Sequence, residues 1–218
     1  MDIGIIGGGI NGLCCAWQLA KQGHQVQLYE RNTLMNATSR ATSKLLHGGL
    51  RYLENREFRL VREALRERDA WIKRAPHLAQ PLRLVMPIYQ QSRRPGWMVA
   101  LGLFLYDHLA GRSQLPKARR LSAQELTRRD PHLKSEGLLG GYEFSDGQMD
   151  DQALGLWVAE QAKHTGVSIA EHTEVTALTQ DGQVITADGA THAHDRLINV
   201  AGPWAHRLLQ ASGLDSPY

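Results

Sequence analysis

A G-x-G-x-x-G pattern at residues 7–12 narrows the choice of fold more than any other part of the sequence. It follows a short apolar run at 2–6 and precedes a segment at 10–22 whose apolar residues recur with a helical period. Alternating polar and apolar residues at 25–29 then predict a second strand. This order predicts a β-α-β unit, and such units build parallel sheets.

The three glycines and an acidic residue beyond them also predict a ligand. In such a pattern one glycine permits the tight turn, one lets a pyrophosphate approach the backbone, and one lets helix and strand pack closely. The start of the helix offers N–H groups and the positive end of its dipole to phosphates. Glu30 ends the second strand 18 residues after Gly12, where its carboxylate can accept hydrogen bonds from a ribose 2′-OH. We therefore expect a dinucleotide other than NADP, with a purely structural turn as the alternative.

The glycine pattern does not distinguish NAD from FAD, but the next segment favours a flavin. A nicotinamide enzyme commonly continues with further short β-α units. Residues 32–49 are instead rich in Ser, Thr, Asn and Gly and predict a long loop with a short helix near Ser43. Hydroxyls and Lys44 can bind a pyrophosphate and the polar edge of a flavin, while Gly48 and Gly49 let the backbone approach a flat ring.

Periodicity predicts further elements along the rest of the chain. Helices are expected at 58–75, 97–109, 151–165 and from Ser122, where Glu125 completes a capping box. Strands are expected at 84–89, 140–144, 167–169, 174–178, 183–187 and 196–200.

Composition and charge exclude several other classes of protein. The formal net charge is only +3, and the basic residues are not interleaved with aromatics, so we expect no nucleic-acid partner. Cys14 and Cys15 are the two cysteines; we expect them to be small buried helix residues in a reduced, cytoplasmic protein. No C-x-x-C or His-rich spacing predicts a metal site, and no window of 18 apolar residues predicts a spanning helix.

A longer pattern resembles a known family. Residues 42–54, T-S-K-L-L-H-G-G-L-R-Y-L-E, resemble the signature of the FAD-dependent, quinone-linked glycerol-3-phosphate dehydrogenases. The similarity continues at 57–61, 75–78, 102–109, 142–146, 150–151 and 199–204. The resemblance implies an α/β fold: a glutathione-reductase-type, Rossmann-like FAD-binding domain with part of an inserted α+β substrate domain. The expected limits are 1–75 and 149–218 for the two FAD-binding segments and 76–148 for the inserted substrate or cap region.

The resemblance also implies a reaction and partners. Members oxidise sn-glycerol 3-phosphate to dihydroxyacetone phosphate by hydride transfer to FAD and pass the electrons to quinone. We therefore expect a cytoplasmic flavoprotein with a peripheral contact at the inner membrane, and a homodimer is compatible with this expectation. Because members are more than twice as long, we expect an N-terminal part or a truncated form, with the catalytic base beyond residue 218.

The resemblance assigns roles residue by residue. The adenosine and pyrophosphate half of FAD is expected at Gly7, Gly9, Asn11, Gly12 and Glu30. The pyrophosphate and the flavin are expected along Thr42, Ser43, Lys44, His47 and Gly49. Further cofactor contacts are expected at Val175, Ala201, Gly202 and Trp204. Arg51 and Tyr52 are expected to face the substrate, with Arg51 binding its phosphate.

The residue chemistry leaves alternatives open for three of these assignments. A guanidinium can hold a phosphate with two parallel hydrogen bonds, but Arg51 could instead form a surface salt bridge with Glu54 or Glu57. Lys44 could be a solvated loop lysine. His47 could be a base or a flavin neighbour, since histidine is the side chain that proteins most easily use for acid–base chemistry near neutral pH, or a side chain packed under the loop.

Alternatives also remain for the function and for one helix. A related FAD oxidase acting on an amino acid or hydroxy acid shares the glycine pattern, and an inactive nucleotide-binding fragment is the third reading. Residues 97–109 are apolar nearly all round, which favours burial in the inserted domain. An interfacial membrane segment following Arg93 and Arg94 is the alternative.

Overall fold

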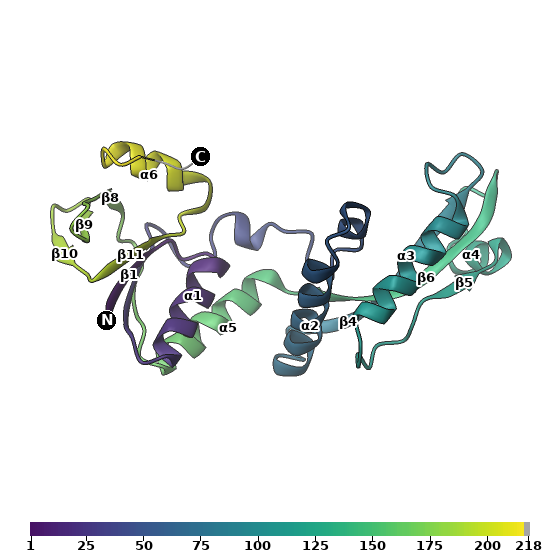
Figure 1. The fold of residues 1–218 in the computed structure, drawn as a ribbon, viewed down its shortest axis with the longest axis horizontal. Helices are drawn as coiled ribbons and strands as arrows, with labels where there is room; N and C mark the ends of the chain where they lie inside the picture. The colour runs from purple at the N-terminus through teal and green to yellow at the C-terminus, as the bar shows by residue number, and fades with distance from the viewer. Residues whose placement is uncertain (216–218) are drawn as a thin grey trace. The chain divides into compact units, whose positions relative to one another are not determined.

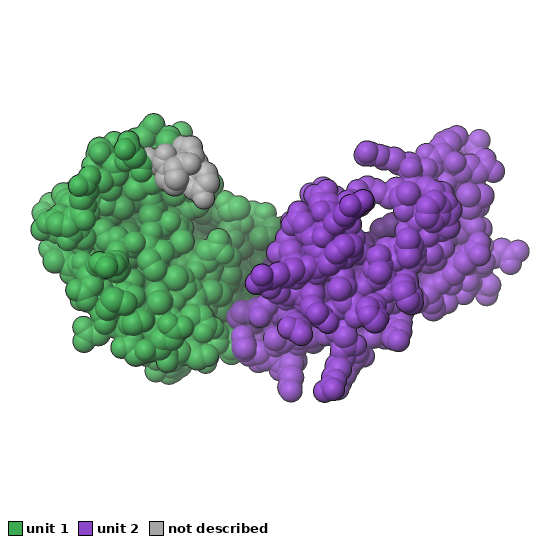
Figure 2. Space-filling model, viewed as in Figure 1, with its two compact units in different colours: residues 1–43, 151–218 green, residues 44–150 purple. Residues whose placement is uncertain are grey.

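The computed structural model describes residues 1–215, which separate into two compact units (Figures 1 and 2). Unit 1 comprises 1–43 together with the chain from Asp151 onward, and unit 2 comprises 44–150. The limits expected for the FAD-binding segments stay a prediction, because compactness does not define which residues contact a cofactor.

Unit 1 is built on a parallel sheet in the order β11-β1-β2-β7. Its strands are β1 (Asp2–Ile6), β2 (Gln25–Tyr29), β7 (Ser168–Ala170) and β11 (Arg196–Asn199). Two helices, α1 (Ile10–Lys21) and α5 (Asp151–His164), pack against each other (Figure 1). Between them the rings of Trp17 and Trp157 meet edge to face at 5.9 Å.

A second, antiparallel sheet in unit 1 has the order β10-β9-β8. Its strands are β8 (Val175–Leu178), β9 (Gln183–Thr186) and β10 (Thr191–Ala193), and the unit also contains the 3-10 helices η1 (Thr38–Arg40) and η3 (Gly202–Trp204) and helix α6 (Ala205–Ala211). The core joins the two sheets and α6 through Ile6, Tyr29, Leu178, Val184 and Leu208.

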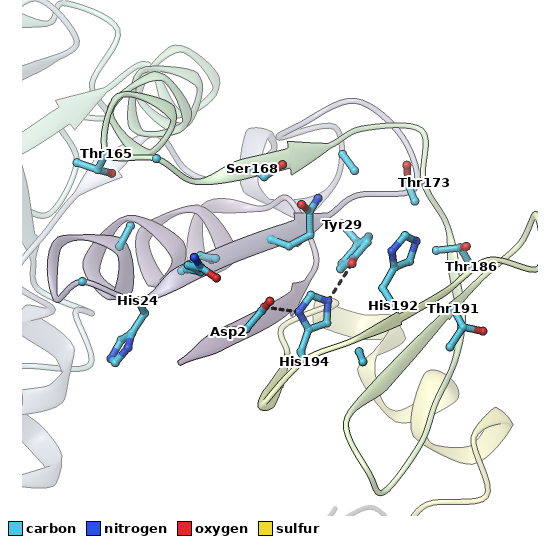
Figure 3. Close-up of a pocket in the computed structure, with 18 of the residues that line it drawn as sticks. Asp2, His24, Tyr29, Thr165, Ser168, Thr173, Thr186, Thr191, His192 and His194 are labelled. Atoms are coloured by element: carbon cyan, nitrogen blue, oxygen red, sulfur yellow. Dashed lines mark hydrogen bonds and ion pairs between the residues drawn. The ribbon is translucent and has the colours of Figure 1, made fainter.

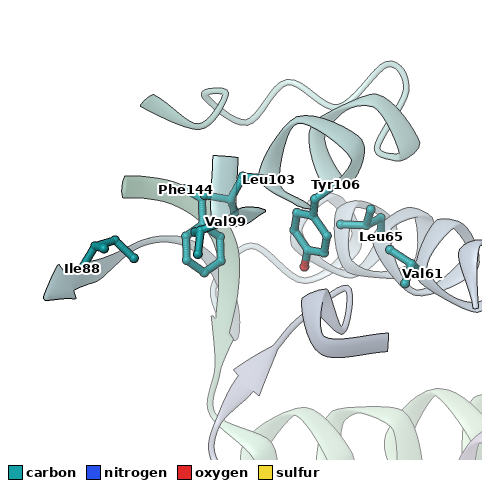
Figure 4. Close-up of a cluster of buried hydrophobic side chains, with 7 residues drawn as sticks. All are labelled: Val61, Leu65, Ile88, Val99, Leu103, Tyr106 and Phe144. Carbon is teal, nitrogen blue, oxygen red and sulfur yellow. The ribbon is translucent and has the colours of Figure 1, made fainter. Parts of the chain in front are cut away.

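Unit 2 is an antiparallel sheet with helices. Its strands are β3 (Leu45–Leu46), β4 (Ala79–Tyr89), β5 (Arg119–Leu121) and β6 (Leu138–Met149), and its helices are η2 (Leu50–Asn55), α2 (Phe58–Arg74), α3 (Gly96–Leu109) and α4 (Ala123–Arg129). The sheet order is β3-β6-β4, with β5 also pairing β6. The core, shown in Figure 4, contains Val61, Leu65, Ile88, Val99, Leu103, Tyr106 and Phe144.

An ion cluster fastens the outer elements of unit 2 to β6. The Glu143 carboxylate lies 3.1 Å from Arg83, 2.8 Å from Arg119 and 2.7 Å from Arg129. The hydrogen bond from Arg129, together with those from the other two arginines, lowers the pKa of Glu143 to about 2. One carboxylate on β6 thus holds side chains from β4, β5 and α4.

Most predicted elements are confirmed. The differences arise where tertiary contacts determine the length or the type of an element. The expected strands at 84–89 and 140–144 are longer, because β4 and β6 pair along almost their full length despite prolines and glycines. No helix forms at Ser43; a 3-10 turn occupies Thr38–Arg40, and Leu45–Leu46 pairs with β6.

Two expectations of burial are wrong. Cys14 and Cys15 are only half-buried, and neither forms a disulfide within residues 1–215. In α3, Val99 and Leu103 are buried, but Trp97 and Phe104 are each 66% exposed. Uniform apolarity therefore did not reveal which face of α3 packs on the unit. No helix among residues 1–215 is long and apolar enough to cross a membrane.

Candidate dinucleotide and flavin site

At two positions of the turn between β1 and α1, a side chain would clash with the backbone of the chain itself, so glycine is required there. Gly7 has φ of +120°, and a Cβ there would lie 2.5 Å from the carbonyl oxygen of Val200 on the neighbouring connection after β11. A Cβ on Gly12 would lie 1.9 Å from the carbonyl oxygen of Gly7. Gly9 is different, because a Cβ there would meet only the Ser39 side chain, with Oγ at 2.8 Å.

The first turn of α1 presents unused donors. Within residues 1–215, the backbone N–H groups of Gly9, Asn11 and Gly12 donate to no acceptor of the chain. The neighbouring N–H of Ile10 donates to Ser39 Oγ at 3.1 Å. Bare amides at the positive end of a helix suit a diphosphate, so the residues present fit the phosphate half of FAD.

Glu30 lies at the end of β2 and is held by the backbone. Its Oε2 accepts the N–H of Gly8 at 2.7 Å, and its Oε1 accepts the N–H of Asn32 at 2.9 Å. A carboxylate has about four lone-pair sites, so each oxygen can accept a further hydrogen bond. These two bonds fix the carboxylate beside the glycine turn, where the sequence predicted it.

The later candidates of unit 1 belong to connections that pack on the same turn. The N–H of Thr173 donates to the Glu30 carbonyl at 2.8 Å, which ties the start of β8, and with it Val175, to the end of β2. A Cβ on Gly7 would lie 3.1 Å from the Cα of Ala201. Gly202, with φ of +57°, turns the chain into η3.

Trp204 lies under a cation. The Arg31 guanidinium lies 4.2 Å from the centroid of the Trp204 ring, a cation–π distance. Because Arg31 directly follows Glu30 in the sequence, this contact links the end of β2 to η3. Two candidates lie within the predicted long loop, and both are exposed: Thr42 donates its N–H (3.1 Å) and its Oγ1 (2.8 Å) to Asp151 Oδ2, and Ser43 follows it.

In unit 2 the remaining candidates occupy one short segment. Lys44 is exposed with φ of +57°, and its carbonyl accepts the N–H of Met149 at 2.9 Å. Gly49 has a left-handed φ of +72°, and a Cβ there would lie 2.3 Å from the Tyr52 ring. His47 is exposed, which argues against a side chain packed under the loop.

Arg51 is available to an anion. The alternative salt bridge is not formed, because Glu54 pairs with Arg94 at 2.5 Å and Arg51 makes no ion pair within residues 1–215. Tyr52 is 36% exposed, and its N–H donates to the Gly49 carbonyl at 2.8 Å, which closes the turn.

A pocket of unit 1 contains none of the predicted site residues. It measures about 1090 Å³ and is lined by β2, β7 and β10 (Figure 3). His194 joins Asp2 Oδ1 at 2.5 Å and Tyr29 Oη at 2.9 Å. Burial, together with the charge of Asp2, raises the pKa of Tyr29 to about 12, so the phenol stays protonated. Among the described residues no cluster of side chains could hold a metal ion, and no buried side-chain polar atom lacks a hydrogen-bond partner, so the glycine turn remains the candidate site.

The structure thus groups the candidates into one set in each unit and adds residues that sequence reasoning missed. Ser39 lay within the hydroxyl-rich loop, which was a signal that could have found it. The cation–π partner of Trp204 and the acceptor for Thr42 had no local signal, because each contact joins segments far apart in the chain.

Comparisons with known proteins identify the family to which the chain is similar. The family described as FAD dependent oxidoreductase matches residues 2–217. The glycerol-3-phosphate dehydrogenase of Pseudomonas aeruginosa is 43% identical over 96% of this chain and 41% of that protein. The D-erythritol 1-phosphate dehydrogenase of Brucella abortus is 42% identical over 93% of this chain and 41% of that protein.

A solved structure shares the fold. The glycerol-3-phosphate dehydrogenase from Bacillus halodurans complexed with FAD superposes with a TM-score of 0.71 at 23% identity, over 97% of this chain and 36% of that one. The expected fold class is confirmed. The chain spans about two fifths of the length of the curated relatives it matches.

Proposed function

The chain belongs to the FAD dependent oxidoreductase family, which confirms FAD as the expected cofactor, and on that premise we propose that it forms the FAD-binding N-terminal part of a polyol-phosphate dehydrogenase. The proposed reaction is oxidation of sn-glycerol 3-phosphate to dihydroxyacetone phosphate. The observation that supports FAD binding is the turn at 7–12, with bare amides on α1 and Glu30 beside them.

Unit 1 residues would hold the nucleotide half. The amides of Gly9, Asn11 and Gly12 would donate to the diphosphate, and Glu30 would accept from the adenosine ribose. Further contacts would come from Thr42, Ser43, Val175, Ala201, Gly202 and Trp204. When bound, FAD supplies the acceptor for the substrate hydride.

Unit 2 residues would hold the flavin and the substrate. Lys44, His47 and Gly49 would lie along the pyrophosphate and flavin. Arg51 would bind the substrate phosphate, because its guanidinium is permanently charged, exposed and without an ion-pair partner in the described chain. The two named relatives act on different phosphorylated polyols, which is consistent with recognition through the phosphate.

Quinone as electron acceptor, a peripheral membrane contact and a homodimer belong to the same proposal. The exposed Trp97 and Phe104 of α3, following Arg93, supply a feature that supports contact with an anionic bilayer. A chain at the cytoplasmic face of the inner membrane would meet both the substrate and the quinone.

The test is substrate-dependent reduction of the flavin in the FAD-loaded protein that contains this chain. We expect sn-glycerol 3-phosphate to bleach the visible flavin absorbance, D-erythritol 1-phosphate to do so less efficiently, and glycerol to have no effect. Equal bleaching by glycerol would contradict the phosphate role of Arg51. Bleaching by glycine or sarcosine instead would favour the oxidase alternative.

A further inference from the structure

A buried hydrogen-bond network lies directly beneath the segment that carries His47, Arg51 and Tyr52. The N–H of Gly48 donates to Tyr106 Oη at 2.7 Å and to Asp146 Oδ1 at 3.2 Å. Figure 4 shows the Tyr106 ring in the core of unit 2, close to Leu65. A backbone donor of the candidate site is therefore held by two side chains from distant elements.

Asp146 fixes the direction of the hydrogen bonds in this network. The Tyr106 hydroxyl lies 3.0 Å from both oxygens of Asp146, to which it donates its proton, so its oxygen is left to accept from Gly48. Arg68 lies 3.2 Å from Asp146 and 2.8 Å from Asp69, and it also donates to the carbonyl of Ser145 at 3.2 Å. Arg68, Tyr106 and Asp146 are 2%, 1% and 3% exposed.

Stability alone does not account for this arrangement. A buried ion pair is often no better for stability than apolar residues of the same volume, because both charges lose their hydration. Such a pair does fix one geometry. Burial, aided by the charge of Asp146, raises the pKa of Tyr106, so the phenol keeps the proton that orients the network.

The network and the strand pairing act on the same short segment. Asp146 lies on β6, and β6 also pairs with Leu45–Leu46 and donates from Met149 to the Lys44 carbonyl. A Cβ on Gly48 would lie 2.4 Å from Leu65 and 2.6 Å from Tyr106 Oη, so the backbone rests directly on α2 and α3. The next residue, Gly49, then takes its left-handed conformation and turns the chain toward Arg51.

We propose that Tyr106 and Asp146 are positioning residues for the catalytic reaction: by holding the N–H of Gly48 they set the conformation of the 47–52 turn that binds flavin and substrate phosphate. The inference rests on the proposed function. Because both side chains are buried, we expect neither to touch substrate or cofactor, and Arg68 pairs with Asp146.

The test compares Tyr106→Phe with Tyr142→Phe in the FAD-loaded protein. Tyr106→Phe removes one oxygen and keeps the ring. Tyr142 packs against the same core, and its hydroxyl has no hydrogen-bond partner within residues 1–215, so Tyr142→Phe is the matched control. The measurements are kcat and KM per bound flavin, the visible flavin spectrum, and hydrogen exchange at the Gly48 amide.

For Tyr106→Phe we expect exchange at Gly48 to accelerate about tenfold and kcat/KM for glycerol 3-phosphate per flavin to fall about fivefold, the size of one buried hydrogen bond. The fall should appear mainly in KM, with a shifted flavin spectrum. A structural role alone would lower flavin content and melting temperature but leave KM and spectrum unchanged, and that result overturns the inference.

Two further outcomes separate this inference from the proposed function. If the wild type binds FAD but oxidises no polyol phosphate, the proposed function fails. In that case a changed flavin spectrum in Tyr106→Phe alone would still support the positioning role of Tyr106, and an unchanged spectrum would refute it. Asp146→Asn gives a second variant, since it keeps the shape and removes the charge. It should reproduce the rise in KM, and a wild-type KM would count against the network.

Discussion

The two glycines at the start of α1 should respond differently to the addition of one methyl group. In Gly12→Ala the new Cβ would lie 1.9 Å from the Gly7 carbonyl oxygen. That oxygen belongs to the backbone, and Gly7 itself is confined by Val200. The turn must therefore move, whether or not a ligand is bound.

The magnitude follows from packing and helix propensity. Overpacking costs roughly 1–3 kcal/mol, and two rigid backbones place Gly12→Ala at the upper end, about 3 kcal/mol. Replacing glycine by alanine in a helix returns up to about 1 kcal/mol. The net loss of about 2 kcal/mol in the free energy of unfolding corresponds to a fall in Tm of roughly 10 °C for a unit of this size.

Gly9→Ala should instead affect the ligand more than the fold. Its Cβ meets only the Ser39 side chain, which can turn away, so the cost in unfolding free energy is about 1 kcal/mol for the lost bond to Ile10. The methyl group occupies the approach to the amides of α1, so we expect FAD affinity to fall at least about tenfold.

The assay is thermal unfolding by circular dichroism without FAD, together with an FAD titration followed by flavin fluorescence. A Gly12→Ala protein with the same Tm as the wild type would refute the steric reasoning. A Gly9→Ala protein with wild-type FAD affinity would refute the placement of the diphosphate.

Three further predictions concern unit 2. Arg51→Ala should raise KM for glycerol 3-phosphate about 10- to 100-fold while FAD stays bound, as steady-state kinetics and flavin content would show; loss of flavin instead would mean that Arg51 serves the cofactor. Because the pKa of Glu143 falls from 4.5 to about 2, its stabilisation is complete above pH 4.5 and is lost as the pH falls toward 2. Glu143→Gln should therefore flatten the dependence of Tm on pH across that window, and an unchanged slope would contradict the ion cluster. Replacing Trp97 and Phe104 by serine should weaken sedimentation with anionic vesicles but not alter FAD content; undiminished binding would exclude α3 as the contact.

The sequence predicted what depends on short-range spacing. The glycine turn, α1 and the position of Glu30 all lie within one β-α-β unit, whose chemistry is local. The capping box of α4 was likewise readable, and it forms as predicted between Ser122 and Glu125.

What could not be predicted depends on segments that meet only in the folded chain. Ser39 reaches the N–H of Ile10 from 29 residues away, and Tyr106 and Asp146 reach Gly48 from 58 and 98 residues away. No periodicity links such partners. The exposed face of α3 could not be predicted from the sequence either, because a helix that is apolar nearly all round does not indicate which of its sides is buried.

The claim that the α1 turn binds the diphosphate of FAD is tested most directly by an NMR titration of the protein with FAD. We predict that the backbone amide signals of Gly9, Asn11 and Gly12 shift the most, because these N–H groups gain acceptors. Saturable FAD binding that leaves these three signals in place would contradict the account.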